Sequence, residues 1–342
     1  MNSRERFIAA CRRETVDRHP VWLMRQAGRY LPEYREIREK YDFLTMCKKS
    51  DLIFEISLQP WRRFGTDAVI VFSDILLPLQ AMGMKLEFEE GSGPRFETKI
   101  LTDSDVKGLS IPNVRLYFSY LLDAMQNLDH ELKEETALLG FIGAPWTLAC
   151  YLIEGGSGDF GSAIKLLHGS PGTAASLMEK LTTVVTPLAV EQIRSGAAAI
   201  QIFDTWGGIL PADDYRKYAL PHVKKIVDAI HRADAPAIIF VRKCSHLIEA
   251  MAETGADVIS IGSEINLSDA IGIVGSRAAI QGNLDPEVLL RSPSMVEMET
   301  QRLLETVGNR SGYIANLGHG VMPATSPESV RAFVETVKRW KI

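Results

Sequence analysis

Eight short runs of β-branched and other apolar residues recur along this chain of 342 residues, and they constrain its fold more than any other feature. The runs cover residues 20–24, 68–74, 137–143, 198–204, 237–241, 256–261, 278–282 and 313–317. Between them lie stretches whose apolar residues recur every three to four positions, the spacing of amphipathic helices. The helices predicted in this way cover residues 52–64, 114–126, 174–195, 213–232, 245–254, 286–307 and 327–340.

Short strands that are apolar throughout indicate a parallel sheet buried on both faces, and eight of them alternating with helices predict an α/β fold of the (β/α)8 TIM-barrel type. No linker rich in Gly, Ser or Pro divides the sequence, so we expect a single domain over residues 1–342. Helix-end signals agree: Ser326 and Pro327 are a typical N-cap and first helical residue, and Gly308 stands where a helix should end. A doubly wound open sheet is the alternative, but no Gly-rich dinucleotide-binding turn follows an early strand.

The composition excludes several classes of protein. A formal net charge of -5 without long Lys/Arg clusters argues against a nucleic-acid partner. No run is apolar and long enough for a signal peptide or a membrane span, so we expect a cytoplasmic protein with no membrane partner. The four cysteines are far apart and form no C-x-x-C pair, which is typical of reduced thiols in the cytosol.

A barrel of this type carries its active site at the C-terminal ends of its strands, so the residues after each predicted strand are the candidates. Arg25 and Arg29 follow the first strand, four residues apart on a loop that contains Gly28. Guanidinium groups are always charged and bind carboxylates in bidentate fashion, so the pair suggests a small-molecule substrate with several carboxylates. A solvated charged turn is the alternative, and the apolar and aromatic neighbours of the two arginines argue against it.

Three more side chains at these strand ends could carry chemistry. Asp74 ends the apolar run VIVFSD, where a carboxylate is either buried against a partner or free for a cationic or N–H-bearing substrate; we favour the second because an unpaired buried charge is costly. His319 stands between two glycines in NLGHG and is either a ligand-facing residue or a packed loop histidine. Tyr151 could offer a phenolic hydrogen bond or could simply be a half-buried core residue.

The motifs of several enzyme classes are absent from the sequence. It has no G-x-S-x-G elbow, no G-x-x-x-x-G-K-S/T phosphate loop and no H-E-x-x-H pair, which argues against acyl transfer, nucleotide hydrolysis and zinc proteolysis. Cys244 and His246 could supply two zinc ligands, but a tetrahedral site needs a third protein ligand and the neighbouring sequence offers none, so we expect no metal.

Six segments match the motifs of a known family. They are MRQAGRYLPEYR (residues 24–35), FSDIL (72–76), GFIGAPWTLACYLIEGG (140–156), QIFDTWGG (201–208), QGNLDP (281–286) and NLGHG (316–320). Together they span nearly the whole chain in the family's order, and the first and third are highly specific. On these motifs the sequence resembles the uroporphyrinogen decarboxylase family.

The resemblance implies a cytoplasmic (β/α)8 enzyme, usually a homodimer, of haem and chlorophyll (porphyrin) biosynthesis. Such enzymes convert uroporphyrinogen III to coproporphyrinogen III: four acetate side chains become methyls with loss of carbon dioxide, and no cofactor or metal takes part. Carried over residue by residue, the resemblance makes residues 25–29 a substrate-binding loop and Asp74 the ligand of the pyrrole N–H groups. The substrate-binding residues that it implies are Arg25, Gln26, Ala27, Gly28, Arg29, Asp74, Tyr151, Thr205 and His319.

The implied catalytic residues are Asp74 and Arg25. Loss of carbon dioxide from an acetate on a pyrrole needs an electron sink, and protonation of the ring at carbon supplies one as an iminium-like cation. A fixed Asp74 anion would stabilise that cation. Proposals for the family name Arg25 as the proton donor, although a pKa above about 12 makes arginine an unusual general acid.

Three places depart from the family pattern. Gly262-Ser263 stands where relatives commonly carry Asp-Trp, Arg242-Lys243-Cys244 replaces a stretch that is usually small and Gly-containing, and Leu44, next to Phe43, takes the place of a phenylalanine. The charges of Arg242 and Lys243 could hold a propionate or could pair with Glu264 and Asp257, and we favour the pairing.

Two rival functions fit parts of the sequence. A corrinoid- or thiol-directed methyltransferase shares the fold but needs a zinc-bound thiolate, to which Cys244 and His246 are a partial match. A non-catalytic tetrapyrrole-binding or carrier protein would keep the pocket without turnover, and the intact Asp74 argues against it.

Overall fold

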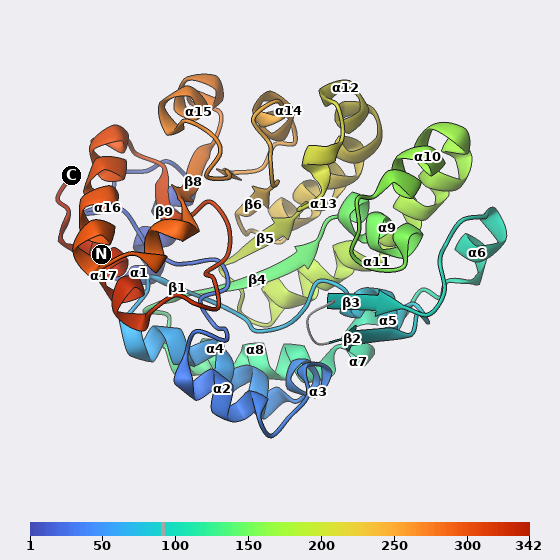
Figure 1. Cartoon of the computed structure of the whole chain (residues 1–342), viewed down its shortest axis with the longest axis horizontal. Helices are drawn as coiled ribbons and strands as arrows, with labels where there is room; N and C mark the ends of the chain where they lie inside the picture. The colour runs from blue at the N-terminus through green and yellow to red at the C-terminus, as the bar shows by residue number, and fades with distance from the viewer. Residues whose placement is uncertain (90–92) are drawn as a thin grey trace.

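A curled parallel sheet of seven strands forms the centre of the molecule, in the order β1-β4-β5-β6-β7-β8-β9 (Figure 1). The computed structural model describes residues 1–89 and 93–342. The strands of this sheet are β1 (Ala68–Ile70), β4 (Ala137–Gly143), β5 (Ala199–Phe203), β6 (Ala237–Phe240), β7 (Val258–Ser260), β8 (Ala279–Leu284) and β9 (Tyr313–Leu317). All neighbouring pairs are parallel, so the seven C-terminal strand ends lie at one end of the sheet.

The first predicted strand, residues 20–24, closes the sheet into a barrel. On one side Val21 forms a single parallel bridge with Ala315 of β9. On the other side, next to the start of β1, the Asp67 amide donates to the Val21 carbonyl at 2.8 Å, and the Val21 amide donates to Asp67 Oδ2 at 2.9 Å. The predicted (β/α)8 fold class is therefore confirmed, with the first strand reduced to one bridge because a side chain takes over part of the backbone pairing.

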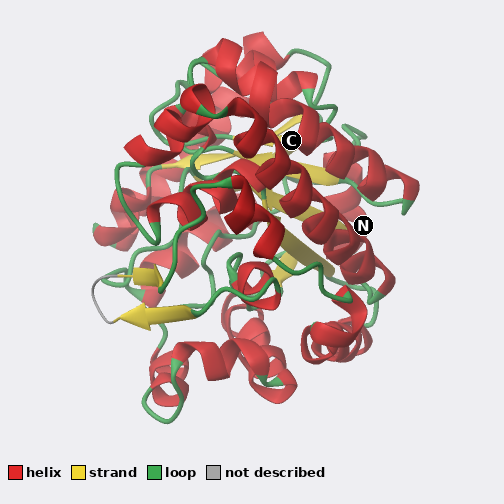
Figure 2. Ribbon diagram, turned by 90° about the vertical axis from the view of Figure 1, so that its right-hand side faces the viewer, coloured by secondary structure: helices red, strands yellow, loops and turns green. Residues whose placement is uncertain are grey.

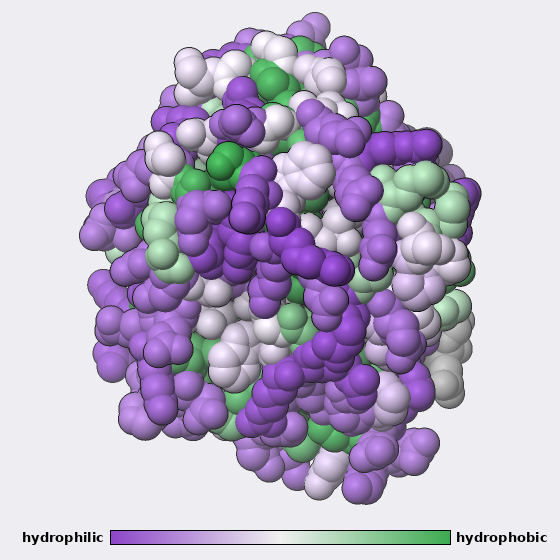
Figure 3. Space-filling view, turned by 90° about the vertical axis from the view of Figure 1, so that its left-hand side faces the viewer, coloured by the Kyte–Doolittle hydropathy of each residue, from purple (hydrophilic) through white to green (hydrophobic). Residues whose placement is uncertain are grey.

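Helices form the outer layer around the strands (Figure 2). The α-helices are α1 (Ser3–Cys11), α2 (Pro32–Arg38), α3 (Phe43–Lys48), α4 (Ser50–Phe64), α5 (Leu77–Ala81), α6 (Asp103–Gly108), α7 (Val114–Tyr117), α8 (Ser119–Leu132), α9 (Pro145–Glu154), α10 (Gly161–Gly169), α11 (Pro171–Arg194), α12 (Ala212–Asp214), α13 (Leu220–Arg232), α14 (Ile248–Glu253), α15 (Leu267–Val274), α16 (Pro293–Val307) and α17 (Pro327–Arg339). The face on which α16 and α17 lie is largely hydrophilic (Figure 3). In the described part of the chain, no helix combines the length and the apolar character that crossing a lipid bilayer requires.

The helix-end signals hold, but several predicted helices are divided. Ser326 caps α17 by accepting a hydrogen bond from the Ser329 amide at 3.0 Å, and Gly308 ends α16 with a φ of 58°. The stretch 213–232 is interrupted by a π-helical turn, η2 (Tyr215–Ala219), and the stretch 286–307 begins with the 3-10 helix η3 (Pro286–Leu290). Proline explains the second break, because Pro293 starts a new helix at its own position.

A two-stranded antiparallel ribbon, β2 (Leu86–Glu89) and β3 (Gly93–Phe96), lies outside the barrel sheet (Figure 2). The sequence analysis did not predict it. An isolated bridge between Arg95 and Gly156 connects the ribbon to the segment after α9. The ribbon therefore borders the C-terminal side of the barrel.

The N-terminal end of the barrel is filled, and this leaves the C-terminal end for a site. Phe7 and Ala10 of α1 are fully buried and belong to one apolar cluster with Ala68, Ala137 and the starts of other strands. Above this cluster, a polar layer crosses the barrel: Trp22 Nε1 donates to Gln281 Oε1 at 2.9 Å, and Gln281 Nε2 donates to Gln201 Oε1 at 3.1 Å. These two hydrogen bonds join the buried polar side chains of Trp22, Gln281 and Gln201 to one another, as buried polar groups require.

Candidate active site

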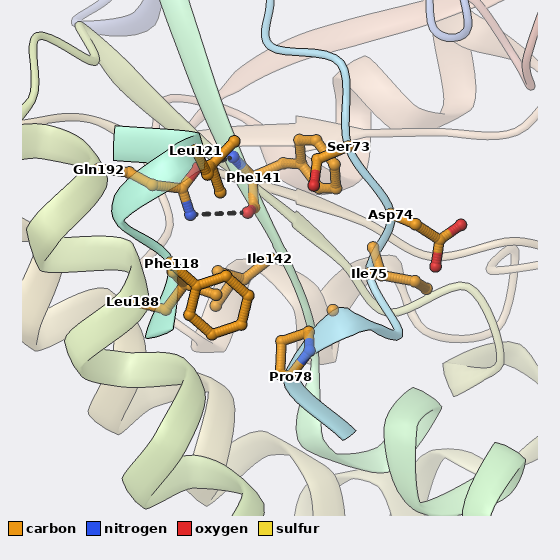
Figure 4. Close-up of a pocket in the computed structure, with 11 residues that line it drawn as sticks. Ser73, Asp74, Ile75, Pro78, Phe118, Leu121, Phe141, Ile142, Leu188 and Gln192 are labelled. Carbon is orange, nitrogen blue, oxygen red and sulfur yellow. Dashed lines mark hydrogen bonds between the residues drawn. The ribbon is translucent and has the colours of Figure 1, made fainter. Parts of the chain in front are cut away.

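The chain leaves the sheet directly after β1 and carries Asp74 to the C-terminal strand ends, here called the barrel mouth. The Val71 amide still donates to Leu139 of β4 at 3.0 Å, but the Phe72 amide donates to the Ser57 hydroxyl of α4 at 2.8 Å. Two residues later, Asp74 Oδ1 accepts a hydrogen bond from the Leu76 amide at 2.8 Å. In Figure 4 the Asp74 carboxylate points away from the apolar side chains of Phe118 and Pro78.

Gln192 of α11 fills the place that β1 vacates beside β4. Its Oε1 accepts a hydrogen bond from the Phe141 amide, and its Nε2 donates to the Phe141 carbonyl, both at 2.9 Å (Figure 4). Gln192 is fully buried, so these two bonds satisfy backbone groups that water cannot reach. Gln192 therefore lets the chain turn toward the mouth at Asp74 without leaving β4 unpaired, a role that the sequence analysis missed.

Burial is the main influence on the Asp74 carboxyl. It raises the pKa of Asp74 to about 6, while the hydrogen bond from Leu76 and the charge of Arg25 act in the opposite direction. The side chain is partly exposed because it borders the mouth. No described residue donates a hydrogen bond to Oδ2 of Asp74, so this oxygen is free to accept N–H groups from a ligand.

The loop with Arg25 and Arg29 is anchored to β9 and to the segment that follows β9. The Met24 amide donates to Asn316 Oδ1 at 3.0 Å, and the Met24 carbonyl accepts from the Val321 amide at 2.9 Å. Arg25 itself has a left-handed backbone with a φ of 60°. Both arginines are exposed, and neither forms an ion pair with a carboxylate of the described residues. They are therefore available to bind an anionic ligand.

Gln26 braces this loop from inside the barrel wall. Its Nε2 donates to the Ala68 carbonyl of β1 at 3.1 Å, its Oε1 accepts from the Leu23 amide at 3.2 Å, and its carbonyl accepts from the Tyr30 hydroxyl at 2.7 Å. The side chain is 1% exposed. The amide side chain of Gln26 is thus committed to the fold, whereas Ala27 and Gly28 beside it are partly exposed.

An aromatic group lines another side of the mouth. Tyr151 of α9 is partly buried, and its ring centroid lies 5.9 Å from that of Phe160 and 6.2 Å from that of Trp206. Burial raises the pKa of Tyr151, and the nearby charge of Asp74 raises it further, so the phenol keeps its proton at neutral pH. Thr205 precedes Trp206 and is partly exposed, as a ligand-contacting residue should be.

Asp204 holds the turn that carries Thr205 and Trp206, and the sequence analysis did not assign it a role. The Thr147 hydroxyl donates to Asp204 Oδ1 at 2.9 Å and accepts a hydrogen bond from the Trp206 amide at 3.0 Å. Asp204 is fully buried, and this burial raises its pKa to about 6, although the Thr147 and Tyr215 hydroxyls act in the opposite direction.

His319 follows β9 and faces the mouth as a neutral side chain. Burial, together with the charges of Arg25 and Arg242, lowers the pKa of His319 to about 4. Its ring centroid lies 6.0 Å from that of Phe240. Gly318 next to it has no space for a side chain, because a Cβ there would lie 2.1 Å from the Ser263 amide nitrogen. At neutral pH His319 can therefore donate or accept a hydrogen bond, but it carries no charge.

The favoured ion pairs of Arg242 and Lys243 are wrong. Glu264 Oε1 accepts a hydrogen bond from the Cys244 amide at 3.1 Å, and Asp257 Oδ2 lies 2.8 Å from His231 Nε2. Both basic side chains are exposed, and no carboxylate in the described ranges pairs with either of them. The prediction failed because the carboxylates of Glu264 and Asp257 contact the Cys244 amide and His231 instead.

The Cys244 and His246 side chains do not form a metal-binding pair. Cys244 is fully buried and burial raises its pKa to about 12, whereas His246 is exposed and its Nε2 lies 2.8 Å from the Leu210 carbonyl. Within residues 1–89 and 93–342, no three His, Cys, Asp or Glu side chains gather in a way that could hold a metal ion. The geometry thus gives the methyltransferase alternative no zinc-bound thiolate.

The fold and the site together define a class: an α/β-barrel protein that carries two exposed arginines without a carboxylate partner in the described residues, and one carboxylate, at the C-terminal ends of its strands. Comparison with known proteins gives the family. The model of the family "Uroporphyrinogen decarboxylase (URO-D)" matches residues 2–340, so this chain belongs to that family. The chain is 45% identical over 335 residues to the uroporphyrinogen decarboxylase of Geobacter metallireducens, with 98% of each chain covered. It is 44% identical over 339 residues to that of Alcanivorax borkumensis, covering 97% of this chain and 96% of the relative.

Solved structures with the same fold carry other activities. A methyltransferase from Methanosarcina mazei has a TM-score of 0.85 with 18% identity, and the match covers 99% of this chain and 98% of the other. A B12-independent methionine synthase from Shewanella has a TM-score of 0.57 with 11% identity, covering 85% of this chain and 87% of the other. At these identities the likeness concerns the fold alone.

Proposed function

We propose that this chain decarboxylates the four acetate side chains of uroporphyrinogen III to methyls and so makes coproporphyrinogen III in porphyrin biosynthesis. The observation that carries the proposal is the Asp74 carboxylate at the barrel mouth. Its Oδ2 accepts no hydrogen bond from the described part of the chain, and its pKa is raised to about 6. A porphyrinogen presents four pyrrole N–H donors toward its centre and carboxylates around its rim. The site offers the complementary groups, with an acceptor at Asp74 and cations at Arg25 and Arg29.

The reaction needs a group that stabilises positive charge on a pyrrole. A proton adds to the pyrrole α-carbon next to the ring carbon that bears the acetate, which gives an iminium-like cation that is conjugated with the acetate-bearing carbon. The bond to the carboxylate then breaks, its electron pair enters the ring system, and carbon dioxide leaves. The exocyclic carbon takes up a proton to become a methyl group and the α-carbon returns its own, so each acetate consumes one proton overall.

Asp74 supplies the charge that this sequence of steps requires. Above its pKa of about 6 it is an anion beside the pyrrole nitrogens, where the positive charge of the intermediate develops. A fixed group aimed at developing charge in a water-poor site is typically worth about 3 kcal/mol of the activation barrier. Arg25 and Arg29 bind substrate carboxylates, and the neutral His319, Tyr151 and Thr205 offer hydrogen bonds without adding charge.

The test is anaerobic incubation with uroporphyrinogen III, with products separated by their number of carboxylates. We expect successive loss from eight carboxylates to four. Asp74→Asn should lower kcat by about 10²- to 10³-fold, because the amide keeps the shape and loses the charge. Asp228→Asn is the matched control, since Asp228 is exposed on α13. Full activity of Asp74→Asn would contradict the mechanism, and an inactive wild type would contradict the function.

We also propose that the chain works in the cytoplasm as a homodimer. The support is the family to which it belongs and the cysteines, which are all free and buried in the described part of the chain. Sedimentation equilibrium of the purified protein should give twice the mass of one chain. A monomer at all accessible concentrations would contradict the dimer without affecting the proposed reaction.

A further inference from the structure

Arg242 forms no ion pair within residues 1–89 and 93–342, and it lies on the side of the mouth opposite to Arg25. It follows β6, which is the fifth strand of the barrel when residues 20–24 are counted as the first. In a closed barrel of eight positions, the first and fifth lie across from each other. The two arginines thus flank the mouth from opposite walls, with Asp74 after the second strand.

The backbone at Arg242 is fixed by its neighbour on the β5 side. A Cβ on Gly208 would lie 2.0 Å from the Arg242 carbonyl oxygen and 2.7 Å from that of Lys243, so the two loops touch. Lys243 continues with a left-handed φ of 55°. The Arg242 side chain therefore starts from a defined position.

The side chain of Arg242 lies over the aromatic wall of the site. Its guanidinium carbon is 6.0 Å from the centroid of the Trp206 ring, close enough for a cation–π interaction. Trp206 in turn contacts Phe160 at 4.5 Å and Tyr151 at 6.2 Å between ring centroids. Because the arginine plane can stack on an aromatic face and still donate at its edge, this contact orients the guanidinium without using its donors.

The charge of Arg242 reaches the same residue as the charge of Arg25. Both lower the pKa of His319, after the larger effect of burial. Because His319 is neutral, it adds no third positive charge to those of Arg25 and Arg242 at the mouth. No carboxylate of the described residues balances Arg242, so its natural partner is an anion from outside the chain.

We propose that Arg242 binds a propionate carboxylate of the substrate and so helps to determine substrate affinity. This proposal rests on the proposed function. A propionate is the more suitable group because the substrate, its intermediates and its product all keep four of them, whereas acetates disappear during the reaction. Arg242 is a binding residue, and no proton or electron passes through it.

The test compares Arg242→Gln, Arg242→Lys and wild type under anaerobic steady-state conditions. Substrates with eight and with five carboxylates are both used. Arg242→Gln should raise KM by about five- to tenfold for both substrates and change kcat less than twofold, the size expected for one charge-assisted contact at a partly exposed site. Arg242→Lys should recover part of the affinity, because it keeps the charge and loses the bidentate fork.

Arg232→Gln is the matched control, because Arg232 is exposed on the last turn of α13 and leads into the opposite end of β6. It should keep the wild-type KM. Added salt should raise the KM of wild type more than that of Arg242→Gln, which would identify the lost contact as ionic. An unchanged KM in Arg242→Gln, or a rise for the substrate with eight carboxylates alone, would overturn the proposal. Turnover by wild type in the same assay separates this failure from failure of the proposed function.

Discussion

Gly320 leaves open the space that the Arg25 side chain occupies. A Cβ on Gly320 would lie 2.3 Å from Arg25 Cδ and 2.6 Å from its Cγ, far inside van der Waals contact. We therefore expect Gly320→Ala to push the Arg25 guanidinium out of position and to raise KM for uroporphyrinogen about tenfold, the equivalent of roughly 1.4 kcal/mol. Steady-state kinetics of the two proteins measure this change.

Gly272→Ala on α15 is the control for this substitution. A Cβ on Gly272 meets nothing within 4 Å, and alanine is a better helix former than glycine, so wild-type kinetics and slightly higher stability are expected. The double variant Gly320→Ala with Arg25→Ala should be no worse than Arg25→Ala alone, because the two closest atoms that the methyl group displaces, Cγ and Cδ of Arg25, are then absent and only the Cβ remains, at 3.0 Å. Independent losses from the two substitutions would argue against a link through Arg25.

The pH dependence of kcat/KM should report the ionisation of Asp74. Its pKa is raised to about 6, and the anion is the active form, so activity should rise with pH through about 6 and level off above it. His319 has a pKa of about 4 and stays neutral over this range. The rising limb should therefore remain in His319→Gln, whatever the loss in absolute rate.

Asp204 needs its own control in this experiment, because burial also raises its pKa to about 6. Asp204 is fully buried and contacts the site through Thr147 and the turn at Trp206. Asp204→Asn should keep the rising limb if Asp74 is the group that titrates. Disappearance of the limb in Asp204→Asn would assign it to Asp204 instead.

The sequence predicted the fold because hydrophobic period and strand spacing are local properties. Alternation of apolar runs and amphipathic stretches was enough to give the barrel and the order of its strands. The barrel then brought Arg25, Asp74, Tyr151 and His319 to one end, since parallel strands share the direction of their C-terminal ends. The roles of these residues in binding and catalysis remain predictions.

The sequence did not reveal the roles of residues whose side chains contact partners on other elements of the fold. Gln192 lies on a helix far along the chain from Phe141, and only the early departure of β1 creates the gap that it fills. Gln26 stands among exposed loop residues, yet its side chain turns into the barrel wall toward Ala68. The predicted ion pairs of Arg242 and Lys243 with Glu264 and Asp257 were wrong for the same reason: separation in sequence does not show in which direction a side chain points.

Gln192→Leu should destabilise the fold. The substitution keeps the volume of the side chain approximately and removes both partners of Phe141, which leaves a buried amide and a carbonyl unpaired. Each such group costs about 1–3 kcal/mol, so we expect the two together to lower the free energy of unfolding by roughly 2–6 kcal/mol. Urea unfolding measures it, with Gln126→Leu on the exposed face of α8 as the control within about 0.5 kcal/mol of wild type.

Asp204 should make stability fall as pH rises. Its carboxyl is fully buried, and its folded-state pKa of about 6 is above the value of 3.8 that an unperturbed Asp has. Between these two values the folded protein binds more protons at this site than the unfolded chain, so the free energy of unfolding decreases with increasing pH and becomes constant above about 6. The shift corresponds to a cost of up to about 3 kcal/mol for the charged form at neutral pH.

Asp204→Asn removes this titration while its amide oxygen can still accept the Thr147 hydroxyl. The variant should therefore gain stability relative to wild type between pH 4 and pH 7, by up to about 3 kcal/mol, as measured by urea unfolding at a series of pH values. Asp228→Asn, which alters an exposed carboxylate on α13, should give a curve parallel to that of wild type. A parallel curve for Asp204→Asn as well would mean that Asp204 titrates alike in the folded and unfolded chains, and that the influence of the Thr147 and Tyr215 hydroxyls fully offsets its burial.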